Sequence, residues 1–186
     1  LWGPLLCDSA PIAVYVEGVA AKGSKTSAGI FYGPGSKYNQ ALRVPGPGHM
    51  SADRARLFAI YQTLLRAPSD KSLLIFCTSK MIDYPTTLLC CCLEQYAGLG
   101  RSNGDLFKAV FQLLAARHGG IRFVHVGTKE DNQSKREAYA LAKAARGIPG
   151  PHSAFQVDEG SIDAIRCEKH KTAESVNVSG GGGFTR

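Results

Sequence analysis

With 186 residues, 44% of them hydrophobic, the chain is sized for a single domain with a substantial core. The net charge of +7 favours an acidic partner such as nucleic acid. The apolar run Leu88–Leu93 is too short to cross a membrane, and no basic segment precedes a long apolar stretch, so we expect neither a membrane span nor a signal peptide.

The six cysteines show no zinc-binding spacing, because there is no Cys-x-x-Cys pair and no paired histidine. Cys90, Cys91 and Cys92 are adjacent within an apolar run, which is more typical of small buried side chains than of disulfides. We therefore expect an intracellular protein of the nucleus or cytoplasm, where thiols stay reduced.

The first elements in chain order form a hairpin. After a leader at residues 1–11, residues 12–17 alternate apolar and other side chains and end in the carboxylate of Glu17, followed by Gly18. A turn rich in lysine and glycine leads to a second strand at 27–32. An acid at the end of a central strand, before a glycine, is where many metal-dependent phosphoryl-transfer sites begin.

The later elements alternate between helices and buried strands. Ser51 is an expected N-cap, and an apolar stripe follows it as far as Pro68. Residues 72–77 are continuously apolar, as a buried parallel strand should be. The expected strands after the hairpin are 40–44, 72–77 and 121–126, and the expected helices are 52–66, 80–97, 104–118 and 134–146.

The resulting element order is β-β-β-α-β-α-α-β-α, which predicts an α/β fold with a mixed five-stranded sheet and helices on both faces. We expect one domain over residues 12–146. Residues 147–186 become polar and glycine-rich, so they are expected to form a C-terminal tail that is partly ordered or flexible.

Several segments follow one another in an order that matches a known family. They are Val14-Tyr-Val-Glu-Gly, Gly29-Ile-Phe-Tyr-Gly-Pro-Gly, Leu42-Arg-Val-Pro-Gly-Pro, Arg54-Ala-Arg-Leu-Phe-Ala-Ile, Cys77-Thr-Ser-Lys, Asn103-Gly-Asp-Leu, Phe123-Val-His-Val-Gly and Ala138-Tyr-Ala-Leu-Ala-Lys-Ala-Ala. These segments resemble type 1 ribonuclease H, most of all the ribonuclease H-like domains of fungal proteins and retroelements. The resemblance covers about residues 12–146 and implies the same fold for them.

The resemblance also implies a site for two Mg²⁺ ions, held by four carboxylates, that cleaves the RNA strand of an RNA–DNA hybrid. In this chain only the first of those positions is acidic. The four positions correspond to Glu17, Arg56, Thr78 and Tyr139, and the family's mobile histidine corresponds to Thr128. We expect the first four to surround one hollow. One carboxylate beside a guanidinium should repel divalent cations, so the sequence predicts no metal or other cofactor.

The favoured interpretation is a pseudoenzyme that binds RNA, an RNA–DNA hybrid or a protein partner in a larger assembly. By the resemblance, several segments of the chain border the hybrid groove, where the family reads backbone and 2′-hydroxyls with main chain and small polar groups. The candidate binding residues are Lys22, Ser24, Lys25, Ser51, Ser79, Lys80, Lys129 and Lys135.

Two alternatives remain open. The chain is an active Mg²⁺-dependent enzyme if displaced acids gather near Glu17, the candidates being Asp53, Glu130, Asp131 and Glu137. Two residues along a helix turn a side chain by about 200°, however, so Glu137 should point away from a site at Tyr139. Otherwise the chain is a purely structural subunit, with the cysteine run and the C-terminal tail as its interaction surfaces.

Overall fold

The computed structural model describes residues 10–20, 26–46, 50–78, 103–127, 132–150 and 155–167. Its five strands fall within two residues of the predicted ones at each end. They are β1 (Ile12–Val19), β2 (Ser27–Phe31), β3 (Gln40–Arg43), β4 (Leu73–Cys77) and β5 (Ile121–His125). The predicted helix at 80–97 and the cysteine run lie outside the described residues.

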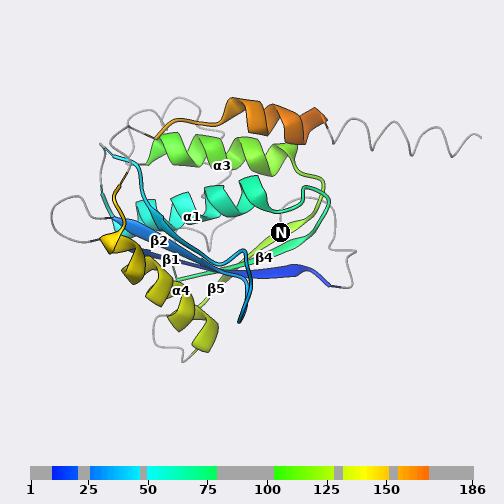
Figure 1. Cartoon of the computed structure of the whole chain (residues 1–186). Coiled ribbons are helices and arrows are strands. Elements are labelled where there is room, and N and C mark those ends of the chain that lie inside the picture. The colour runs from blue at the N-terminus through cyan, green and yellow to red at the C-terminus, as the bar shows by residue number, and fades with distance from the viewer. Residues whose placement is uncertain are drawn as a thin grey trace, which may run out of the picture.

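The strands form one mixed sheet in the order β3-β2-β1-β4-β5, as Figure 1 shows. The hairpin makes β1 antiparallel to β2, and β2 antiparallel to β3. β4 and β5 are parallel to β1, because the chain returns to the same end of the sheet before each of them. The predicted α/β fold with a mixed five-stranded sheet is therefore confirmed.

Helices cover both faces of this sheet. α1 (Ala52–Arg66) and α3 (Gly104–Ala116) lie on one face, and α4 (Gln133–Ala144) lies on the other (Figure 1). The residues of β1 alternate accordingly: Val14 and Val16 are buried in the core beneath α1, while the neighbouring odd-numbered positions face the side of α4.

α1 begins and ends at identifiable contacts. The Ser51 hydroxyl accepts a hydrogen bond from the amide of Arg54 at 3.0 Å, which caps the helix as its sequence predicts. At the other end, the buried guanidinium of Arg117 donates to the carbonyls of Leu64 and Ala67, at 2.9 and 2.7 Å. It also donates to two carbonyls of the turn that follows the helix. These bonds satisfy carbonyls that a helix end leaves without partners.

Residues 155–167 follow α4 in the chain and add to the hydrophobic core beside α1. Residues 159–167 are helical, and Ile162 is fully buried in the main hydrophobic cluster. Before them, the ring of Phe155 stands edge-on to those of Phe58 and Tyr61 on α1. The Tyr61 hydroxyl accepts a hydrogen bond from the amide of Asp158 at 3.1 Å. None of the helices in the described residues is long and apolar enough to cross a bilayer.

Candidate functional site at the carboxyl ends of β1 and β4

The candidate site lies where the pairing of β1 with β4 ends. Both strands are parallel, so their carboxyl ends meet at one edge, and Val16 pairs with Cys77 as the last residue of β4. Glu17 and Thr78 follow these two residues and are neighbours for the same reason. Glu17 is also in register with Gly29 of β2, so its side chain belongs to the α4 side of the sheet.

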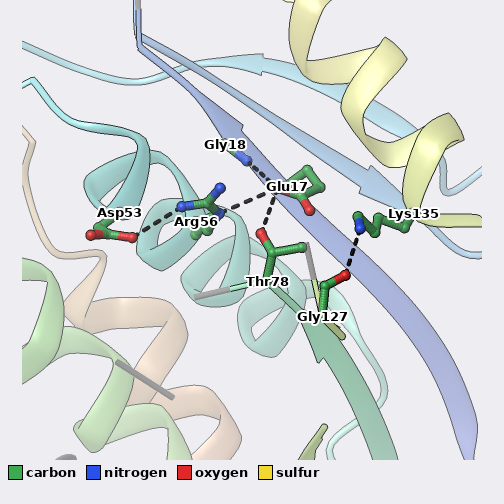
Figure 2. Close-up of polar contacts among 7 residues, drawn as sticks. All are labelled: Glu17, Gly18, Asp53, Arg56, Thr78, Gly127 and Lys135. Atoms are coloured by element: carbon green, nitrogen blue, oxygen red, sulfur yellow. Dashed lines mark hydrogen bonds and ion pairs between the residues drawn. The ribbon is translucent and has the colours of Figure 1, made fainter. Parts of the chain in front are cut away.

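Glu17 is almost completely buried, with 4% of its surface exposed. One of its carboxylate oxygens accepts hydrogen bonds from three neighbouring residues. Figure 2 shows Oε2 accepting from the Thr78 hydroxyl at 3.0 Å and from Nε of Arg56 at 3.2 Å. A longer contact of 3.4 Å comes from the amide of Gly18. A buried carboxylate is costly unless it is paired, and these three donors are its hydrogen-bond partners.

Arg56 binds a second carboxylate as well. Its NH1 group donates to Asp53 Oδ1 at 3.0 Å, one turn earlier on α1 (Figure 2). The side chain of Arg56 is 19% exposed, whereas that of Asp53 is 43% exposed. Asp53 is one of the candidate displaced metal ligands, but its carboxylate binds the same guanidinium that pairs with Glu17.

Gly18 allows Arg56 to come this close. A Cβ at Gly18 would stand 2.3 Å from the carbonyl oxygen of Ala52 and 2.9 Å from the amide nitrogen of Arg56. Both atoms belong to the backbone of α1, so the helix would have to move away from β1. The Glu17-Gly18 pair in the sequence therefore supplies the acid and the space in which its partner lies.

A shallow hollow, with no room for an enclosed water molecule, adjoins Glu17 on the side of α4. Its polar lining residues are Glu17, Thr78 and Lys135, and the rings of Tyr15 and Phe76, stacked at 4.5 Å, form part of its wall. Lys135 comes from the first turn of α4 and donates to the carbonyl of Gly127 at 2.7 Å (Figure 2). Lys135 therefore lines the same hollow as Glu17, while the ion pair of the Glu17 carboxylate is formed with Arg56.

The structure corrects one expectation about this hollow. Hydrogen bonds bring Arg56 and Thr78 to Glu17, but of the four residues only Glu17 and Thr78 line the hollow, and Tyr139 is 49% exposed. α4 begins at Gln133, capped by Asn132, so its first turn lies at the hollow and Tyr139 comes about 6 Å further along the helix than Lys135.

The candidate binding residues are only partly described. Ser51 is the N-cap of α1, so its oxygen already accepts a hydrogen bond, and Lys135 lines the hollow. Glu137, one of the displaced acids, is exposed on α4. The remaining candidates lie outside the described residues: Lys22, Ser24, Lys25, Ser79, Lys80, Thr128, Lys129, Glu130 and Asp131.

A second ion pair, which sequence reasoning missed, ties α1 to α3 close to the site. Arg54 is buried and forms two parallel bonds to Asp105, at 2.8 and 2.7 Å, with a longer bond to the side chain of Asn103. The Arg54 guanidinium holds the pKa of Asp105 below its usual range. The signal was present, since Arg54 and Asn103-Gly-Asp are both segments of the resemblance.

The charged groups of this site do not suit a pair of Mg²⁺ ions. Glu17 is one carboxylate where several are required, and the guanidinium of Arg56 already occupies one of its oxygens. Within the described part of the chain, no three His, Cys, Asp or Glu side chains are grouped closely enough to hold a metal ion. Neither models of protein families nor curated proteins yield a match to this sequence.

Proposed function

We propose that this chain is a ribonuclease H-like domain that binds RNA or an RNA–DNA hybrid without cleaving it. The observation that carries the proposal is the 3.2 Å ion pair between Arg56 Nε and Glu17 Oε2. By the resemblance, these two residues stand where two metal-binding acids would be. Their pairing neutralises the acid that remains and gives a guanidinium the place of a bridging carboxylate.

Contacts between the resembling segments support the assignment. Glu17 and Thr78 come from two of these segments and share a hydrogen bond of 3.0 Å. Arg54 and Asp105 come from two others and form the buried ion pair. A strand order of β3-β2-β1-β4-β5, in which β2 alone runs opposite to the other four strands, agrees with the fold that the resemblance implies.

The loss of cleavage follows from electrostatics. Two metal ions about 4 Å apart need several carboxylates around them to offset their mutual repulsion. Arg56 cannot release its proton at any physiological pH, and Thr78 contributes only a hydroxyl whose proton is donated to Glu17. No step of metal-dependent hydrolysis is therefore assigned to these residues.

The binding of nucleic acid is supported by charge and by the groups at the hollow. The chain carries a net charge of +7, and Lys135 stands at the rim with its ammonium 2.7 Å from a carbonyl oxygen. Thr78 retains acceptor capacity toward a 2′-hydroxyl, since its oxygen uses only its proton on Glu17. A phosphate near Lys135 would add a charge-assisted hydrogen bond.

The test is binding of fluorescein-labelled RNA–DNA hybrid, single-stranded RNA and double-stranded RNA, measured by anisotropy at several salt concentrations. We expect binding that weakens with salt, with a log–log slope of roughly −0.7 to −0.9 for each phosphate contacted. Lys135→Glu should weaken binding and flatten the slope, whereas the matched control Lys108→Glu, at an exposed position on α3, should leave both unchanged. Absence of any salt-dependent binding would favour a purely structural subunit.

A further inference from the structure

α4 is fixed against the sheet by unusually close backbone contacts. A Cβ at Gly29 would lie 2.0 Å from the carbonyl oxygen of Ala138, so glycine in β2 lets the helix backbone approach the strand. One turn later, the Ser27 hydroxyl donates to the carbonyl of Ala142 at 2.6 Å. Ala138 and Ala142 are both completely buried. The inner face of α4 is thus held in one position by small residues.

The outer face of the same helix presents a row of three larger side chains. Arg136, Tyr139 and Lys143 are spaced by three and then four residues, which places them on one side of an α-helix. All three are exposed, and Tyr139 is one of the most exposed large hydrophobic side chains among the described residues. We call these three residues the α4 stripe.

The packing of α4 does not account for Tyr139. The helix packs on the sheet through Ala138 and Ala142. About half of the surface of Tyr139 is exposed to water, so burial of its ring contributes little to the stability of the fold. Most of the charged residues of α4 are also positive. Three cations, Lys135, Arg136 and Lys143, accompany a single acid, Glu137.

We infer that the α4 stripe binds single-stranded RNA, with a base stacked on Tyr139 and phosphates contacted by Arg136 and Lys143. An exposed aromatic ring flanked by cations is the combination that holds single strands without reading their sequence. The inference rests on the proposed function for its class of partner. Continuity favours it too, because Lys135 at the hollow immediately precedes the stripe in the first turn of α4.

The dimensions of the stripe suit a short piece of one strand. Seven residues at about 1.5 Å per residue separate Arg136 from Lys143 by about 10 Å. A distance of that size is enough for two phosphates of one short strand to lie on the two cations with a base between them. In a duplex the bases stack on one another, so none is available to the ring of Tyr139, and the stripe should prefer a single strand.

The experiment uses the whole chain and a fluorescein-labelled 12-nucleotide oligouridylate, with anisotropy measured from low to moderate salt. Tyr139→Ala should weaken binding by about 5- to 100-fold, the range expected when one stacked base is lost. Tyr139→Phe should bind within twofold of the natural chain, because stacking does not need the hydroxyl. Lys143→Gln should flatten the log–log salt slope by about 0.7, the contribution of one phosphate on a single strand.

Tyr38→Ala is the matched control, since Tyr38 is 57% exposed, with the Lys37 ammonium 5.3 Å from the centre of its ring. It should leave binding unchanged, and thermal melting should show that every variant is folded. If Tyr139→Ala and Lys143→Gln bind like the natural chain, the stripe is not the site. If the chain binds a labelled hybrid but no oligouridylate, this inference fails while the proposed function stands. Binding of neither nucleic acid overturns both.

Discussion

Replacing Arg56 with methionine would remove the positive partner of a buried carboxylate. Methionine keeps most of the side-chain volume, so the change isolates the loss of charge and hydrogen bonds. Glu17 would retain the Thr78 hydroxyl at 3.0 Å and the long contact from Gly18 at 3.4 Å. Neither group carries a charge that offsets the carboxylate.

The structure sets the size of the effect. Opposite charges 3.2 Å apart attract by about 5 kcal/mol at an effective dielectric constant of about 20, before the cost of desolvation is subtracted. Breaking a buried pair by removing one partner typically costs about 3–5 kcal/mol. Because the Arg56 side chain is 19% exposed, we expect the lower end, about 3 kcal/mol of unfolding free energy. For a chain of this size that lowers the melting temperature by roughly 6–12 °C.

The assay is urea unfolding of four proteins: the natural chain, Arg56→Met, Glu17→Gln and the double variant. The double variant should recover much of the loss, giving a coupling of about 2 kcal/mol, because it leaves no buried unpaired charge. Arg166→Met is the control, since Arg166 forms an exposed pair with Asp163 at 2.8 Å and should cost less than about 0.5 kcal/mol. Additive single effects, within about 0.5 kcal/mol, would refute the ion pair as the stabiliser of Glu17.

Three further changes test contacts that hold the site in place. Asp105→Asn should cost about 2 kcal/mol at neutral pH by removing the partner of Arg54. Since the folded pKa of Asp105 is lowered, this difference from the natural chain should be complete above about pH 4 and disappear as the pH falls through the folded pKa, as acid titrations of stability would show. Burial lowers the pKa of Arg117 to about 10, so the group remains charged at neutral pH. Arg117→Met should lower the free energy of unfolding in urea by about 3 kcal/mol, because four carbonyls lose their donor. Gly29→Ala should cost about 3 kcal/mol by pushing α4 off the sheet, and a loss below about 1 kcal/mol would contradict the close approach at Ala138.

The sequence was sufficient for the sheet because its strands are marked by local patterns. Alternation identified β1, a continuous apolar run identified β4, and the Ser51 cap identified the start of α1. Each of these signals acts within a few residues and agrees with the packing that surrounds it. Such agreement between local preference and tertiary structure is what makes an element predictable.

The details of the site were less accessible. The pairing of Glu17 with Arg56 follows from two segments aligned by the resemblance. The i,i+3 spacing of Asp53 and Arg56 permits their ion pair, but it does not show that one guanidinium binds both acids. The position of Lys135 depends on where α4 starts, and helix boundaries are set by caps such as Asn132 and by neighbouring chain. The misplacement of Tyr139 has a different origin: the start of α4 was predicted to within one residue, and the expected position of Tyr139 came from the resemblance.

Incubation of the purified chain with a labelled RNA–DNA hybrid, in Mg²⁺ and separately in Mn²⁺, tests the central claim most directly. An active ribonuclease H serves as the positive control, and Glu17→Ala serves as the matched negative control. We expect the natural chain to release no more product than Glu17→Ala in either metal, because Arg56 neutralises the one carboxylate at the expected metal position. Metal-dependent cleavage by the natural chain that Glu17→Ala abolishes would contradict this account.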